Sequence, residues 1–138
     1  MVNNIKISVF LLGITLGAFT SALYALDDTK KYYHLNSSQI IGYFAGRTLH
    51  SLNVRTRTEV LTYLSKDGSM KQSIKSSNTQ RRGKWHAANH QLCLSWQQSD
   101  GEYCFDKVLF RDELFYLVKG TQVETIVHTG DDGDTTGF

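Results

Sequence analysis

Cys93 and Cys104 are the residues with the clearest capacity for chemistry, because thiols form disulfides, bind metal ions or work as redox pairs. Alternating apolar residues flank both cysteines, and a short polar turn separates them. Antiparallel pairing across this turn places Leu94 opposite Tyr103 and the two cysteines opposite each other. Cross-strand Cβ atoms about 4.5–5.5 Å apart are close to the reach of a disulfide. We therefore predict a structural disulfide within one hairpin.

Redox and metal chemistry are the alternatives for these cysteines. Redox motifs usually hold their cysteines two residues apart, and a zinc site would need two further ligands in register. His86 and His90 are four residues apart, which in a strand separates them by roughly 13 Å, too far to share a zinc ion. His34, His50 and His128 lie in separate elements. We expect solvated histidines, no metal site and no cofactor.

Residues 1–25 have the layout of a secretory signal peptide. Lys6 precedes an uncharged apolar run over residues 7–22 that ends in small residues, and cleavage is expected at about residue 25. The alternative is an uncleaved anchor, because residues 7–26 are just long enough to span a bilayer. Glycine and hydroxyl residues dilute the hydrophobicity of the run, so we favour cleavage. Under both interpretations the chain is exported. Cleavage predicts a periplasmic or secreted protein, and an uncleaved anchor predicts a membrane-anchored protein that faces the periplasm.

The residues after the leader divide into a linker, one domain and a tail. Residues 26–35 form a mixed linker, and residues 36–128 form the domain, which begins with a short helix over 37–45. Asn36 is a good N-cap, and Gln39 sits where it completes a capping box. Residues 129–138 are polar and glycine-rich, and we expect a flexible acidic tail whose three aspartates lack the bidentate glutamate of an EF-hand calcium loop.

From Arg47 onward the apolar pattern alternates, which predicts a mainly β fold. We predict eight short strands, at residues 47–53, 57–65, 69–76, 81–87, 91–97, 102–109, 113–119 and 122–128. Evenly spaced strands joined by tight turns predict a small eight-stranded antiparallel meander barrel, which has no exposed edge strand. The alternative is an open or sandwiched antiparallel sheet. We expect side chains such as Val60, Leu64, Tyr116 and Val118 to fill most of the interior.

Four short motifs give the chain a family resemblance. They are Gly46-Arg47-Thr48, the turn from Tyr63 to Gly68, Gly83-Lys84-Trp85, and Cys93 with Trp96 and Cys104. In this order, and over about residues 36–128, the chain resembles the small secreted bacterial proteins grouped as domain of unknown function nine-nine-five. The resemblance implies a small calycin-like barrel. It implies no activity, so it carries over no catalytic residue.

Charge is distributed unevenly along the chain. Residues 47–84 hold nine Lys and Arg against two acids, whereas the residues from Asp100 onward hold nine acids against three cations. In a sequential meander, the first four strands form one wall and the last four the other, so we expect a basic side and an acidic side. Arg81, Arg82, Lys84 and Trp85 combine cations with an aromatic ring, as in proteins that hold anionic polymers or lipid headgroups. They are the candidate partner-binding residues, and a solvated strand face is the alternative.

These features favour an exported, non-enzymatic binding module that recognises a macromolecule or a small apolar ligand. An envelope-associated structural or accessory subunit, anchored by an uncleaved N-terminal helix, is the alternative, and an enzyme inhibitor or hydrolase is more distant. The sequence contains no G-x-S-x-G elbow and no phosphate-binding glycine-rich loop. We expect the partner to be a protein, an envelope polymer or a small apolar molecule. A net charge of +2 does not favour nucleic acid, and membrane contact requires a retained N-terminal segment.

Overall fold

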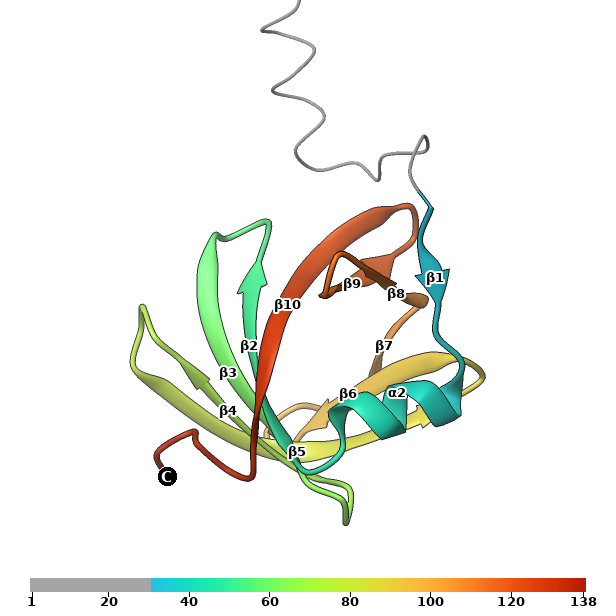
Figure 1. The fold of residues 1–138 in the computed structure, drawn as a ribbon. Coiled ribbons are helices and arrows are strands. Elements are labelled where there is room, and N and C mark those ends of the chain that lie inside the picture. Colours follow the sequence, from blue (N-terminus) through green and yellow to red (C-terminus); the bar gives the residue numbers. More distant parts are fainter. Residues whose placement is uncertain (1–30) are drawn as a thin grey trace, which may run out of the picture. The chain divides into compact units, whose positions relative to one another are not determined.

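Ten strands and one short helix make up residues 31–138, the part of the chain that the computed structural model describes (Figure 1). The predicted signal peptide or anchor, residues 1–25, lies outside the described residues. The helix is α2 (Ser37–Phe44). The strands are β1 (Tyr33–His34), β2 (Arg47–Asn53), β3 (Thr58–Leu64), β4 (Ser69–Ile74), β5 (Thr79–Ala88), β6 (Gln91–Trp96), β7 (Tyr103–Phe105), β8 (Lys107–Arg111), β9 (Leu114–Lys119) and β10 (Gln122–Asp132).

All ten strands belong to one antiparallel sheet in the order β1-β8-β9-β10-β2-β3-β4-β5-β6-β7. The predicted mainly β antiparallel fold with one short helix is therefore confirmed. The predicted number of strands, eight, is wrong for two reasons. Residues Tyr33–His34 of the predicted linker form β1 against β8, and Asp106 divides the predicted strand 102–109 into β7 and β8.

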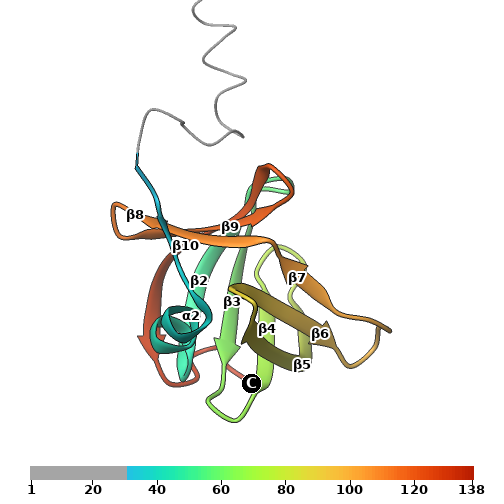
Figure 2. The same ribbon diagram turned by 90° about the vertical axis from the view of Figure 1, so that its right-hand side faces the viewer.

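The sheet curls into a half-barrel (Figures 1 and 2). The end strand β7, which pairs with β6, continues through Asp106 into β8, which lies between β9 and the other end strand, β1. The backbone N–H of Asp106 donates to the carbonyl oxygen of Val118 at 2.8 Å and so stays on the β9 side of this junction. The curled sheet encloses the core.

Helix α2 begins with the predicted capping box and covers part of the core. The Asn36 side chain accepts from the Gln39 backbone N–H, and the Gln39 side chain accepts from the Asn36 backbone N–H, both at 2.9 Å. These bonds satisfy two backbone donors at the helix start. Ile40 and Phe44 are fully buried, and the Phe44 ring meets the Phe115 ring edge to face with centroids 4.9 Å apart. The helix thereby joins the inner surface of the sheet.

The C-terminal segment contacts the sheet, in contrast to the flexible tail that the sequence predicted. Strand β10 continues to Asp132 along β2, so the boundary at residue 129 is wrong. Beyond the strand, the fully buried hydroxyl of Thr48 donates to the carbonyl of Gly133 at 2.7 Å and accepts from the backbone N–H of Thr135 at 2.8 Å. Thr136 is buried as well. Pairing with the full length of β2 holds these residues against the sheet.

Candidate functional site

The four predicted partner-binding residues lie on β5 but do not share a face. Side chains alternate along a strand, and Arg81 and Trp85 point to the concave face whereas Arg82 and Lys84 point to the outer face. Arg81 bonds a residue that lines the interior, Gln72. Trp85 belongs to the hydrophobic core. The basic patch inferred from consecutive residues is therefore split between two surfaces.

Trp85 is not available to a partner, which corrects the sequence prediction. Only 7% of the residue is exposed, and its indole N–H donates to the carbonyl oxygen of Ser65 at 2.7 Å. Its backbone N–H donates to the carbonyl oxygen of Gly68 at 2.9 Å. These bonds tie β5 to the β3–β4 turn, so Trp85 is a structural residue.

Arg81 is held in a fixed orientation on the concave face. Its Nε donates to Oε1 of the buried Gln72 at 2.8 Å, and Nε2 of Gln72 donates to Oγ1 of Thr62 at 3.0 Å. The guanidinium carbon lies 4.0 Å from the centre of the Trp96 ring, within the range of a cation–π contact. Desolvation lowers the pKa of Arg81, although the residue as a whole is exposed. Two contacts on different sides therefore fix the plane of the guanidinium.

Arg82 and its cross-strand neighbour Lys71 hold an aromatic ring on the outer face. The two residues are directly opposite each other on β5 and β4. The ring centre of Phe138 lies 5.1 Å from the Arg82 guanidinium and 5.6 Å from the Lys71 ammonium. Lys71 also donates to Asp134 at 2.8 Å and to the backbone oxygen of Phe138 at 2.6 Å. The segment 134–138 thus lies against the basic strands.

A groove of about 560 Å³ runs beside these side chains. We call it the arginine–tryptophan groove, and it is lined by Gln80, Arg81, Arg82, Trp96, Gln97, Gln98, Ser99 and Phe138. Within residues 31–138, no acidic side chain lies within ion-pair distance of Arg81 or Arg82. The sequence prediction found the two arginines but missed Trp96, although Trp96 alternates with Leu92 and Leu94 toward the same face as Arg81.

The predicted separation into a basic and an acidic side is not what the structure shows. Because β10 pairs with β2, the acidic end of the chain lies beside the basic strands rather than opposite them. The resulting ion pairs are Arg47–Asp132, His50–Asp131, Arg55–Glu124 and Lys71–Asp134. The hydrogen bond from His50, followed by that from Thr135, lowers the pKa of Asp131. Among residues 31–138, Arg81 and Arg82 have no such acidic partner, a state that they share with Lys66 and Lys84.

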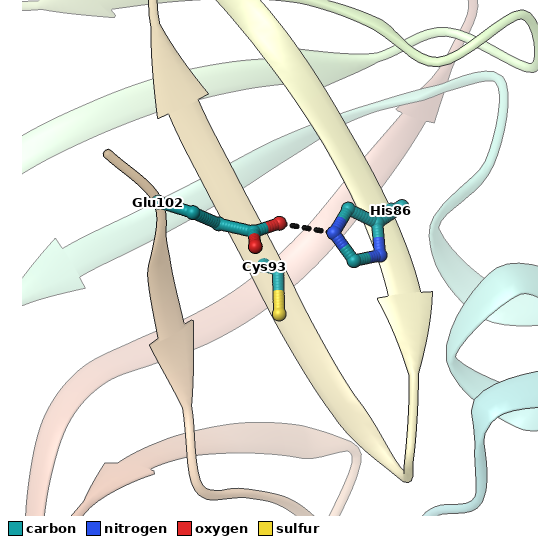
Figure 3. Close-up of side chains that lie close together, drawn as sticks. All are labelled: His86, Cys93 and Glu102. Atoms are coloured by element: carbon teal, nitrogen blue, oxygen red, sulfur yellow. Dashed lines mark hydrogen bonds and ion pairs between the residues drawn. The ribbon is translucent and has the colours of Figure 1, made fainter. Parts of the chain in front are cut away.

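The predicted disulfide is present, and two polar side chains lie beside it. Cys93 and Cys104 are bonded and directly opposite on β6 and β7, with Leu94 opposite Tyr103 as predicted. His86 is the cross-strand partner of Cys93 on its other side, and its Nε2 pairs with the Glu102 carboxylate (Figure 3). The sequence prediction treated His86 with His90, four residues away, and did not connect it with Glu102.

The interior of the half-barrel contains a cavity of about 70 Å³, lined mainly by apolar side chains. Pockets that hold small molecules measure roughly 300–1,000 Å³, so the interior is largely filled, as expected. Val60 and Leu64 line this cavity. Tyr116 does not, because its neighbour Leu117 takes the inward position; the Tyr116 ring instead meets Tyr32, with centroids 5.4 Å apart.

The motifs that carry the family resemblance have structural roles in this chain. Gly46 and Gly68 have positive φ angles of 77° and 92°, which glycine adopts without strain. Thr48 and Trp85 are buried and hydrogen-bonded to backbone groups, and Cys93 is part of the disulfide. These residues shape turns and join strands, so they point to no activity.

Comparisons with known proteins return no match: no family model, no curated protein and no solved structure is significantly similar to the chain. The resemblance to domain of unknown function nine-nine-five therefore stays a prediction. Within residues 31–138, no helix is both long enough and apolar enough to cross a bilayer. The disulfide indicates an oxidising, extracytoplasmic compartment.

Proposed function

We propose that the chain is an exported, non-enzymatic binding module and that the arginine–tryptophan groove is its binding surface. The observation that carries the proposal is the state of Arg81. Its guanidinium is oriented by Gln72 and Trp96 and, among residues 31–138, has no acidic side chain within ion-pair distance. Because this exposed cation is already held in one orientation, an anionic ligand would pair with it at little further cost in side-chain entropy.

The lining of the groove favours an anionic polysaccharide of the cell envelope as the ligand. A planar guanidinium recognises a carboxylate through two parallel hydrogen bonds, and Nε of Arg81 is already used, which leaves the outer edge for the ligand. Gln80, Gln97 and Gln98 supply amides that both donate and accept hydrogen bonds. Such groups match the hydroxyls of a sugar chain beside its carboxylates.

The other predicted ligand classes have less support. A small apolar ligand has little room inside the half-barrel, because the interior cavity of about 70 Å³ is well below the volume of a ligand pocket. A hydrolase that cleaves sugar chains needs two carboxylates at one site, and Glu59 and Glu102 are each in a separate ion pair, with Lys75 and with His86. An anchored accessory subunit depends on residues 1–25, which lie outside the described residues.

The test measures binding of an oligogalacturonate, a carboxylated sugar chain, and of a neutral oligosaccharide of equal length. Calorimetry with the full chain at low and at high salt gives the two affinities. We expect binding of the carboxylated chain only, weakened by salt, and weakened roughly tenfold or more by Arg81→Gln, since hydrogen bonds to charged groups contribute about 1.5–3 kcal/mol.

Lys107→Gln is the matched control, because it removes one positive charge from an exposed position of β8 that does not line the groove. This variant should bind like the wild type. Equal binding of the neutral oligosaccharide, or equal losses in Arg81→Gln and Lys107→Gln, would show that the groove does not recognise the anion.

A further inference from the structure

Four side chains with metal-binding atoms lie side by side across three neighbouring strands. His86 on β5 is opposite Cys93 on β6, and Cys93 is opposite Cys104 on β7. Glu102 is two residues before Cys104 and therefore points to the same face, where it pairs with His86. The register that forms the disulfide thus also brings an imidazole and a carboxylate beside it (Figure 3).

The distances among three of these four groups suit a single metal ion, and Sγ of the fourth, Cys104, is bonded to Sγ of Cys93. A nitrogen of His86, Sγ of Cys93 and a carboxylate oxygen of Glu102 all lie within 4.8 Å of one another. Tetrahedral zinc, with bonds of roughly 2.0–2.3 Å, holds its ligand atoms roughly 3.3–3.8 Å apart, so movements on the order of 1 Å would complete the geometry. The side chains of His86 and Glu102 are 54% and 44% exposed, which leaves them room to move.

The oxidation state of the sulfurs decides whether this donor set can work. In the oxidised chain the two sulfurs are bonded to each other, and the species that binds zinc is the thiolate. Reduction would add two thiolate sulfurs to the nitrogen of His86 and the oxygen of Glu102. Four ligands of these types make a closed tetrahedral zinc site. His86 and Glu102 are the two further ligands in register that the sequence alone did not reveal.

We propose that reduction of the Cys93–Cys104 disulfide converts this cluster into a zinc site. A dithiol reductant supplies two electrons and two protons, so the S–S bond breaks, two thiols form and the reductant becomes a disulfide. Zn²⁺ then binds both sulfurs, His86 and Glu102, and the two thiol protons pass to water. The inference is independent of the groove, because none of these four residues lines it.

The experiment titrates Zn²⁺ and Co²⁺ into the full chain, with the disulfide intact and after reduction by a phosphine. We expect the reduced chain to bind a single ion, to release two protons per zinc, and to show the visible bands of tetrahedral cobalt thiolate. The oxidised chain should bind at least roughly 100-fold more weakly, because it offers no thiolate.

Variants assign the two ligands that are not cysteines. His86→Ala and Glu102→Gln should each weaken zinc binding by the reduced chain roughly tenfold or more. His128→Ala, which removes an exposed histidine of β10 outside the cluster, is the control and should leave the affinity unchanged. Equal affinity of the oxidised and reduced chains, or zinc binding that survives His86→Ala and Glu102→Gln unchanged, would overturn the proposal.

Unfolding of the chain on reduction of the disulfide would also allow a test of the proposed zinc site. If the reduced, metal-free chain unfolds, zinc must restore the β-sheet circular dichroism of the wild type and must fail to restore that of His86→Ala. A reduced wild type that stays unfolded at saturating zinc contradicts the proposed site.

Discussion

The two halves of β5 have opposite environments within one strand. Residues 79–82 are all exposed and include both groove arginines, whereas residues 83–88 include the buried Trp85 and the closely packed Gly83. The same alternation of side chains runs through both halves, so secondary structure does not cause the difference. The neighbours of each half cause the difference. Residues 83–88 face the core and α2, whereas residues 79–82 face β4 and the groove. One strand thus combines a structural segment with a candidate binding segment.

The largest effect should come from Trp85→Ala in the structural half. Removing a buried tryptophan leaves a cavity and takes away one of the two hydrogen bonds that the Ser65 carbonyl accepts, and such truncations cost about 3–5 kcal/mol. Chemical denaturation should show this loss of unfolding free energy. Trp96→Ala, three residues from Cys93 but only partly buried, is the comparison and should cost clearly less. A smaller loss for Trp85→Ala than for Trp96→Ala would reverse the assignment of the two tryptophans.

Local sequence patterns predicted the features that depend on neighbouring residues. The capping box at Asn36 and the Cys93–Cys104 register follow from spacing alone, because each involves one helix turn or one hairpin. The burial of Trp85 was not predicted: alternation places Trp85 on the same face as Arg81, but only the packing of the core against the second half of β5 buries it. Arg81 and Arg82 are consecutive, so the sequence grouped them on one surface, whereas neighbouring side chains of a strand point to opposite faces, although both residues line the groove.

Long-range pairing was beyond the reach of these patterns. The Lys71–Asp134 ion pair joins residues 63 positions apart, and it exists because β10 returns to pair with β2. His86 and Glu102 meet across β6 because β5 and β7 both pair with that strand. Neither contact has a local signal, so the prediction of a basic wall and an acidic wall was wrong, and the cluster beside the disulfide was missed.

The next largest loss of stability is expected from a substitution at the closely packed Gly83. A Cβ atom there would lie 2.0 Å from the carbonyl oxygen of Ser95 and 3.1 Å from the side chain of Met70. Gly83→Ala should therefore destabilise the chain by about 1–3 kcal/mol, as overpacking does. Gly42→Ala is the control, because a Cβ in α2 at that position meets nothing within 4 Å and should stabilise the helix by about 0.5–1 kcal/mol. Similar midpoints of thermal unfolding for both variants would contradict the packing argument.

A smaller effect separates the two arginines of the exposed half. Arg81→Gln removes a hydrogen bond to the buried Gln72, which should reduce the unfolding free energy by about 0.5–1.5 kcal/mol. Arg82→Gln removes only a contact with the Phe138 ring, and surface substitutions of this kind change stability by about 0.5 kcal/mol or less. Urea titrations in parallel measure both values. A larger loss for Arg82→Gln would show that the ring contact, rather than the buried hydrogen bond, stabilises this half of β5.

The smallest effect concerns the acid that holds segment 134–138 against the exposed half. Burial opposes ionisation of Asp134, but the hydrogen bonds from Lys71 and Thr136 outweigh it and lower its pKa from 3.8. An acid with a lowered native pKa stabilises the fold fully above its unfolded pKa and loses this contribution as the pH falls toward the native value. Asp134→Asn should therefore be less stable than the wild type above about pH 5, and the difference should shrink below pH 3.8. A stability difference that stays constant between pH 6 and the acid limb would mean that Asp134 acts through packing rather than through its charge, and that the cations of β4 and β5 do not hold this segment.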